Sequence, residues 1–192
     1  MQPRTTPWTA QDEAAAHMDD DAALGAELAA MVAGARRRAV RDGDRQIDTA
    51  HLLHSLLEHD PEARAVVGGP PQLARLLGYL VQRSIGYGLR WQGSVEDSGA
   101  LAVLPTTAVP GAREPRDTAG WSPAAAAALA DARERARLRG EPRATGVDLL
   151  AALTADPGSR AAEVLERAGI RDLDTRIAGG AEECAGDGEP VH

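Results

Sequence analysis

The sequence has 192 residues and a formal net charge of -8, so it lacks the basic surplus with which proteins meet a nucleic-acid backbone. Hydrophobic residues make up 43%, enough for a packed core, but aromatic residues make up only 3% and Phe is absent, which leaves Leu, Val and Ala as core residues. Because Ala is the best helix former and strands favour β-branched and aromatic residues, this composition predicts an all-α protein. The absence of Lys excludes Schiff-base chemistry and a P-loop lysine.

The two ends of the chain predict a soluble, cytoplasmic protein. Residues 1–18 contain no apolar stretch as long as the core of a signal peptide, and no segment approaches the ~20 apolar residues that span a bilayer. The single cysteine, Cys184, lies in a Gly-rich acidic tail and cannot form an internal disulfide. We expect residues 1–18 and 179–192 to be disordered, and we expect no membrane partner.

The first predicted unit spans residues 19–85. Its first helix ends near Gly43, where a C-terminal glycine is expected. Asp48 or Thr49 can cap the second helix, and the break at residues 68–71 precedes the last one. The apolar positions are Leu24, Leu28, Val32, Ala35 and Ala39 in the first helix, Leu52, Leu53, Leu56 and Leu57 in the second, Val66 and Val67 in a short segment, and Leu73, Leu76, Leu77, Leu80 and Val81 in the last.

Residues 86–119 separate this unit from the next and are rich in Gly, Pro, Ser and Thr. A connection of this length is unusual inside a compact domain. It is either a flexible linker or a loop with a binding role of its own.

The second predicted unit spans residues 120–178 and repeats the plan of the first. Ser122 caps its first helix with Pro123 in the first turn, and Thr145 with Asp148 resembles a capping box before the second helix. The remaining apolar positions are Ala161, Val164, Leu165 and Ala168 in a third helix and Ile170, Leu173 and Ile177 in a shorter fourth.

An internal duplication relates the two units. An offset of 97 residues, which sets Ala35 against Ala132, also pairs Gly43 with Gly140. The same offset sets Leu52, Leu53 and Leu56 against Leu149, Leu150 and Leu153. Matching Ala pairs carry little weight in an Ala-rich chain, but the Gly pair and three Leu pairs in register predict two copies of one helical unit.

The duplicated unit resembles the amino-terminal repeat of the Clp unfoldases. The segment from Ile47 to Leu53, IDTAHLL, resembles the family's IGTEHLLLGL stretch, and Trp121-Ser122-Pro123 resembles the FTP that opens a repeat. The resemblance implies one all-α domain of two pseudo-symmetric four-helix repeats, which receives adaptors and substrates in front of the ATPase rings. Since the chain has no P-loop motif, it looks like a stand-alone ClpC-like amino-terminal domain, as found in some actinobacteria.

The resemblance also implies candidate binding residues. In the ClpC branch the Glu of GTEH and the Thr of FT help to bind phosphoarginine. The Glu positions here are Ala50 and Val147, and the Thr positions are Gly25 and Ser122, so we predict weak or absent phosphoarginine binding. Trp121 stands at the aromatic position that, in related domains, helps to form a surface used by cyclic-peptide antibiotics; a packing role is the alternative.

A metal site is the other candidate. His51, His54 and Glu58 share one helical face and could hold Zn²⁺. No fourth ligand is evident and Asp148 stands in place of His51 in the second copy, which favours an ordinary solvated surface and no cofactor.

Three functions follow from these patterns. The first is a non-enzymatic binding module of the Clp system, acting as an adaptor, regulator or decoy. The second is a sequestration protein that binds Clp-directed cyclic-peptide antibiotics. The third is an enzyme of unknown type on a helical scaffold, although no nucleophile elbow and no H-E-x-x-H motif supports catalytic residues.

Overall fold

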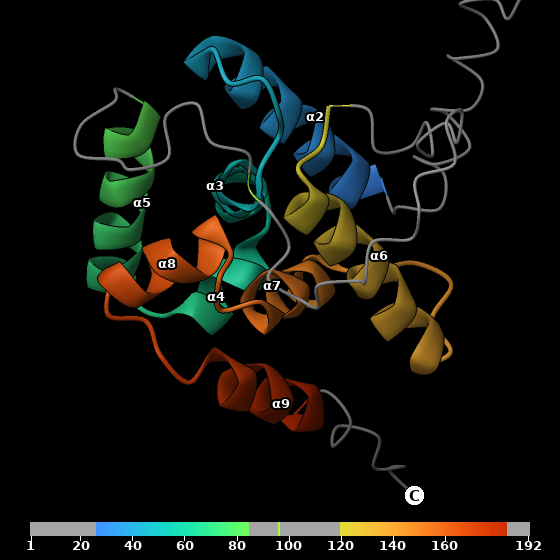
Figure 1. Cartoon of the computed structure of the whole chain (residues 1–192). Coiled ribbons are helices and arrows are strands. Elements are labelled where there is room, and N and C mark those ends of the chain that lie inside the picture. Colours follow the sequence, from blue (N-terminus) through green and yellow to red (C-terminus); the bar gives the residue numbers. More distant parts are fainter. Residues whose placement is uncertain (1–25, 85–95, 97–119, 184–192) are drawn as a thin grey trace, which may run out of the picture.

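The computed structural model describes residues 26–84, 96 and 120–183, which form helices joined by short loops (Figure 1). An isolated parallel β-bridge joins Ile47 to Trp121. The all-α prediction is confirmed. The helices within the described residues are α2 (Ala26–Asp42), α3 (Thr49–His59), α4 (Pro61–Val67), α5 (Pro70–Ser84), α6 (Pro123–Leu138), α7 (Gly146–Ala155), α8 (Arg160–Arg167) and α9 (Leu173–Glu183).

Side chains predicted to cap the helices do so. Asp48 accepts from the backbone N–H of His51 at the start of α3, and Thr145 with Asp148 forms a capping box at the start of α7. Ser122 accepts from the N–H of Ala125 at the start of α6, where a proline occupies the first helical position. Local sequence alone therefore places three of the helix starts.

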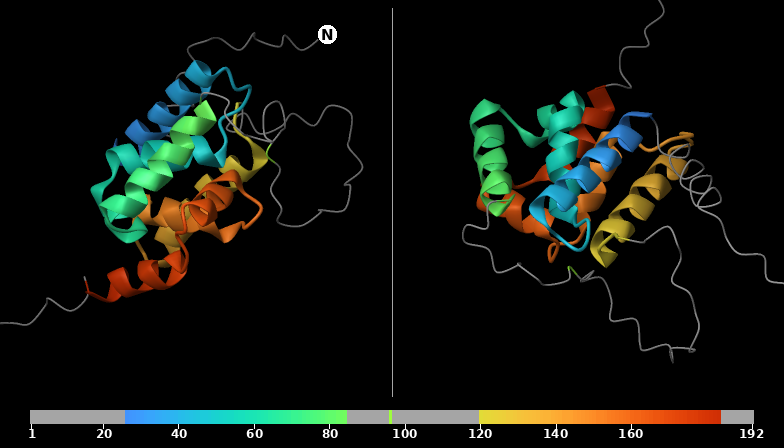
Figure 2. Two further views of the ribbon diagram at one scale, coloured as in Figure 1. Left: turned by 90° about the vertical axis from the view of Figure 1, so that its left-hand side faces the viewer. Right: turned by 90° about the horizontal axis from the view of Figure 1, so that it is seen from above.

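The core lies around α3 and α7, which run through the middle of the molecule (Figures 1 and 2). Every residue of α3 from Thr49 to Leu57 is buried, so this helix is enclosed on all sides rather than on one stripe. The largest fully buried side chains are aliphatic in the main, and they include Leu52, Leu53, Leu56 and Leu57 of α3 and Leu149, Leu150 and Leu153 of α7. A core built from leucine and alanine compensates for the lack of phenylalanine, because small residues let the helices approach closely.

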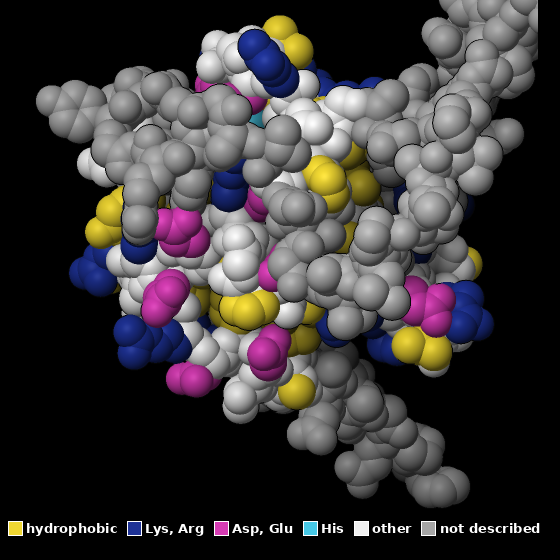
Figure 3. Space-filling model, viewed as in Figure 1, with side chains coloured by type: hydrophobic (Ala, Val, Ile, Leu, Met, Phe, Trp, Pro, Cys, Tyr) yellow, Lys and Arg dark blue, Asp and Glu magenta, His cyan; other side chains and the backbone are white. Residues whose placement is uncertain are grey.

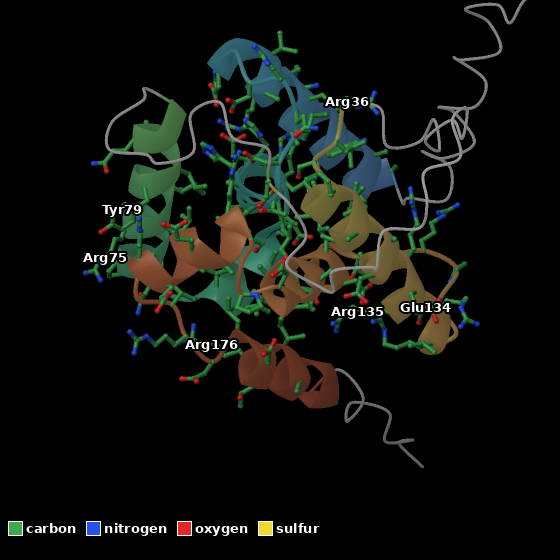
Figure 4. All side chains as sticks on the ribbon, in the orientation of Figure 1. Arg36, Arg75, Tyr79, Glu134, Arg135 and Arg176 are labelled. Atoms are coloured by element: carbon green, nitrogen blue, oxygen red, sulfur yellow. The ribbon has the colours of Figure 1, made fainter. Side chains whose placement is uncertain are left out.

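We call helices α2–α5 the first half and helices α6–α9 the second half, and helices of the two halves pair reciprocally. α3 packs against α8 as α4 packs against α7, and α5 packs against α8 as α4 packs against α9. Arg75 of α5 donates to the carbonyl oxygen of Ala168 after α8 (3.5 Å), and Arg176 of α9 donates to that of Val67 at the end of α4 (2.8 Å; Figure 4). Each arginine thus meets the negative end of a short helix in the other half.

The bounds of the first two helices in each half correspond at the offset of 97 residues. Asp42, where α2 ends, corresponds to Arg139, the C-cap of α6, and Thr49 of α3 corresponds to Gly146 of α7. Both α2 and α6 are followed by a glycine in the left-handed region, Gly43 with φ 73° and Gly140 with φ 77°. A common origin of the two halves remains a prediction that these coincidences favour.

The last helix departs from the predicted boundary. We expected disorder from residue 179, but α9 continues to Glu183, so that boundary is placed too early. The end of α9 has a polar, glycine-rich sequence that does not indicate a helix, but buried Leu173 and half-buried Ile177 pack this helix against the core. None of the helices in the described chain combines the length and the apolar character needed to cross a membrane.

Candidate functional site: a buried carboxylate and two unequal clefts

The structure separates the residues that the family resemblance singled out. Ala50 is buried in α3, Val147 is half-buried in α7, and Gly25 lies outside the described residues. Trp121 and Ser122 stand together at the start of α6, beside the start of α3. The substituted positions that the structure describes therefore do not form one exposed patch.

Trp121 is a packing residue in this structure. It is 7% exposed, belongs to the hydrophobic core and pairs with Ile47 through the isolated bridge. The guanidinium of Arg36 lies 5.7 Å from the centre of its ring, within the range of a cation–π contact. Figure 4 shows Arg36 on α2, the helix beside α6. The indole is thus covered by its own chain.

Ser122 contacts Glu96, a residue that the sequence analysis did not identify as a candidate. Besides capping α6, its hydroxyl donates to Oε2 of Glu96 over 2.8 Å. Glu96 comes from the segment between the two halves and is 5% exposed. A carboxylate in such a position requires several donors, because a buried charge without partners is strongly unfavourable.

Four donors surround that carboxylate, which we call the Glu96 centre together with Thr49, Ser122 and Arg160. The backbone N–H of Thr49 donates to Oε2 over 2.9 Å, and the N–H of Arg160 donates to Oε1 over 2.7 Å. The hydroxyl of Thr49 also donates to Oε1 and itself accepts from the N–H of Ala161 over 3.0 Å. Hydroxyl and backbone donors at the starts of α3, α6 and α8 thus converge on one carboxylate.

An ion pair lies next to the Glu96 centre. The guanidinium of Arg160 contacts Oδ2 of Asp48, and both side chains are largely buried. Asp48 is also the cap of α3, so this pair joins the start of α3 to the start of α8. The arrangement links the two halves through charge-assisted hydrogen bonds as well as through apolar packing.

The three residues predicted as metal ligands are not gathered into one set. His51 turns toward the loop before α3, where its Nε2 lies 3.1 Å from Oδ2 of Asp44 and its Nδ1 lies 2.8 Å from Oδ1 of Asp48. Donor atoms of Asp44, Asp48 and His51 all lie within 4.8 Å of one another. The N–H of Asp48, however, donates to Nδ1 over 3.1 Å, which leaves the proton of a neutral ring on Nε2. This Nε2 is buried and makes no hydrogen bond within the described residues, although the Asp44 carboxylate lies 3.1 Å from it.

His54 and Glu58 belong to a separate contact. Nε2 of His54 lies 3.9 Å from Oε1 of Glu58, and that carboxylate pairs with Arg38 of α2. Burial, together with the charge of Arg38, lowers the pKa of His54 to about 4. The ring is therefore neutral at neutral pH.

A cleft of about 600 Å³ opens where the first half meets the start of α7; we call it the open cleft. Buried Leu28, Met31 and Leu56 line it as apolar side chains. Its lining also includes the carboxylates of Glu27, Asp60 and Glu62, the guanidinium of Arg143 and the imidazole of His59. Such a combination of apolar and charged groups is typical of sites that bind a ligand or a segment of a partner.

A smaller cleft of about 180 Å³ stands in the corresponding position of the second half. The offset of 97 residues relates the two linings: Met31 corresponds to Ala128, Leu56 to Leu153, and Gly146 to Thr49. Alanines dominate this smaller cleft, and Thr49 at its edge belongs to the Glu96 centre. The two halves therefore contain unequal clefts, of which the first is larger and more charged.

Gly146 explains part of this difference. A Cβ at this position would lie 1.7 Å from Oδ2 of Asp60, so the carboxylate of Asp60 occupies the space that the Thr49 side chain fills in the other half. Oδ1 of Asp60 accepts from the N–H groups of Glu62 and Ala63 at the start of α4. A carboxylate thus lies at the start of the third helix of each half, Asp60 at α4 and Glu96 at α8.

Sequence reasoning found Ser122 and Asp48 because capping is a local pattern, but it missed Glu96, Arg160 and the open cleft. Glu96 lies in a segment without helical periodicity, and its partners are 26 to 64 residues away along the chain. One signal was present: a single Glu beside Val95 in a stretch dominated by small residues.

Comparison with models of known protein families gives no match for this chain, and no curated protein matches it. A similar solved structure comes from "Preliminary structural investigations of a malarial protein secretion system". It is 16% identical, the match covers 82% of this chain and 93% of that one, and the TM-score is 0.54. At this identity the likeness shows a shared helical fold and nothing about function.

Proposed function

We propose that this chain is a non-enzymatic protein-binding module of the Clp chaperone-protease system. It would act in the cytoplasm as an adaptor, regulator or decoy of a Clp unfoldase amino-terminal domain. The sequence resemblance supports the family, and the helical fold is compatible with it. The observation that carries the binding role is the open cleft, with its apolar residues and its charged residues on the surface.

The charges of the open cleft indicate the kind of partner. The cleft has more acidic than basic side chains, namely Glu27, Asp60 and Glu62 against Arg143. It therefore suits a segment with an apolar side chain flanked by basic residues. On the face that Figure 3 shows, basic and acidic side chains are interspersed. With a net charge of -8 as well, we include neither nucleic acid nor a membrane among the partners.

The Glu96 centre supports the expectation of weak or absent phosphoarginine binding. The hydroxyl of Ser122, which the resemblance assigns to the phosphate, donates to Glu96 instead. Ala50 is buried and offers no carboxylate for a guanidinium. Calorimetry with free phosphoarginine should therefore give no measurable heat; a micromolar affinity would contradict this part of the proposal.

The two alternative functions receive less support. Trp121 is 7% exposed and offers little aromatic surface to a cyclic peptide. Three buried serines use their hydroxyls in structural hydrogen bonds and do not donate to a catalytic base. The Ser55 hydroxyl donates to the carbonyl oxygen of Met31, that of Ser122 to Glu96, and that of Ser159 to the carbonyl oxygen of Leu153.

A pull-down with a matched pair of charge variants tests the proposed function. The full chain is immobilised, incubated with purified Clp unfoldase and with a lysate, and the retained proteins are identified by mass spectrometry. Glu62→Arg reverses a charge in the open cleft, whereas Glu166→Arg makes the same charge change at an exposed position of α8 outside both clefts.

We expect the parent chain and Glu166→Arg to retain a Clp subunit or adaptor, and Glu62→Arg to weaken that interaction about tenfold or more. Retention of no Clp component by any of the three proteins would rule out the proposed function. Equal retention by both variants would place the interaction outside the open cleft.

A further inference from the structure

The starts of α4 and α8 differ in one backbone donor. Pro61 occupies the first helical position of α4, so this helix has no N–H there, and Asp60 accepts from the next two N–H groups. The first position of α8 is Arg160, whose N–H is present and points inward to Glu96. No N–H at either first position is therefore left without an acceptor: Pro61 has no N–H, and Glu96 accepts the N–H of Arg160.

Every donor at the start of α8 has a separate acceptor. The N–H of Arg160 donates to Glu96, that of Ala161 to the hydroxyl of Thr49, and that of Ala162 to the hydroxyl of Ser159. The N–H of Thr49 at the start of α3 also donates to Glu96. Two helices of eight residues or more therefore direct the positive ends of their dipoles at the same carboxylate.

Two buried hydroxyls make the arrangement more than a pair of helix ends. Thr49 and Ser122 are 1% and 0% exposed, and both hydroxyls donate to the oxygens of Glu96. The four donors divide evenly, two to each carboxylate oxygen. This geometry matches a planar carboxylate with two equivalent oxygens, and the donors belong to elements on both sides of the segment that supplies Glu96.

We infer that the starts of α3, α6 and α8 form a carboxylate-binding site, and that Glu96 is its intramolecular ligand. The donors belong to the helical scaffold, and the carboxylate is the separable part. Removing that carboxylate by mutation leaves a cavity lined by four buried donors, which a small free carboxylate fills. This inference is independent of the proposed Clp partner.

Chemical rescue of Glu96→Ala tests this inference. Thermal unfolding is followed by far-UV circular dichroism for the parent chain, Glu96→Ala and Glu96→Gln, each in sodium chloride, formate, acetate and phosphate at equal ionic strength. In chloride we expect Glu96→Ala to melt roughly 5–10 °C below the parent chain, because several buried donors lose their acceptor. Formate or acetate at about 100 mM should restore roughly 3–5 °C of this loss in Glu96→Ala.

The other proteins and anions are the controls. Glu96→Gln fills the cavity with an uncharged group, so it should melt below the parent chain and gain no more from formate or acetate than the parent chain does. If Glu96→Ala does not fold in chloride, the recovery of helical signal on adding formate is the equivalent result. If neither formate nor acetate raises the melting temperature of Glu96→Ala by more than it raises that of the parent chain, the inference is overturned. Stronger rescue by phosphate than by formate or acetate overturns the assignment to carboxylates.

Discussion

The contact between α2 and α3 passes through Gly34, and the substitution Gly34→Ala should destabilise the protein. A Cβ added at this buried position would lie 2.2 Å from Oγ of Ser55 and 3.3 Å from Cε1 of His59. Oγ of Ser55 donates to the carbonyl oxygen of Met31 over 2.6 Å, so it cannot turn away without losing that hydrogen bond. The glycine is therefore required by the close approach of the two helices.

The opposing contributions can be compared. Alanine in a helix is favoured over glycine by about 1 kcal/mol. Displacing Ser55 costs about 1–3 kcal/mol for a buried hydroxyl without a partner, and overpacking costs about 1–3 kcal/mol. The net expectation is a loss of about 3 kcal/mol, which is a decrease of about 1.5 M in the urea midpoint for an m-value of about 2 kcal/mol/M.

Urea unfolding followed by circular dichroism measures this effect, and the chain provides a matched control. Gly78 also lies in a helix, α5, but a Cβ there meets nothing within 4 Å, so Gly78→Ala should raise the midpoint slightly. Adding Ser55→Ala to Gly34→Ala removes the obstructing oxygen and should recover part of the loss. A midpoint for Gly34→Ala equal to or above that of the parent chain would refute the reasoning.

Two further predictions concern charges. The unfolded chain protonates His54 from about pH 6.5 downward and the folded chain only near pH 4, so acidification across this window favours unfolding. His54→Gln should remove about 2 kcal/mol of this pH dependence, allowing for partial solvent screening, in urea titrations at pH 4.5 and 7.5. A variant whose unfolding free energy depends on pH as strongly as that of the parent chain would contradict this prediction. Arg160→Ala removes the guanidinium that pairs with Asp48 and should lower the free energy of unfolding by about 3 kcal/mol in the same assay. Arg137→Ala, which breaks an exposed pair with Glu134, should have no measurable effect. Equal effects of the two substitutions would show that burial does not determine the strength of these pairs.

Local patterns allowed most of the helices to be predicted from the sequence. Ser122, Thr145 and Asp148 cap helices because a side chain reaches an N–H three residues away, which needs no tertiary information. Gly43 and Gly140 end helices for a similarly local reason, their left-handed backbone. These positions are found from one sequence because cause and effect lie within a few residues.

The site required the fold. Glu96 and Arg160 meet only when α3 and α8 are packed together, and neither residue stands out in its own segment. The orientation of His51 was predicted from helical spacing alone, but Asp44 and Asp48 of the preceding loop determine it. The open cleft depends on the small size of Gly146 and on the place of Asp60, whose proximity no sequence spacing indicates. Long-range contacts account for the missed Glu96 centre and open cleft, whereas His51 takes its orientation from residues of the nearby loop, which helical spacing does not describe.

The different helix starts of the two halves affect how the protein can be divided. The start of α4 is capped by Asp60 and Pro61, so a fragment holding the first half contains all the groups that this start needs. The start of α8 takes acceptors from Thr49 and Glu96, both of which precede the second half in the chain. A fragment that begins at residue 120 would therefore lack both, and co-expression with a first-half fragment extended through Glu96 should rescue it better than lengthening its C-terminus.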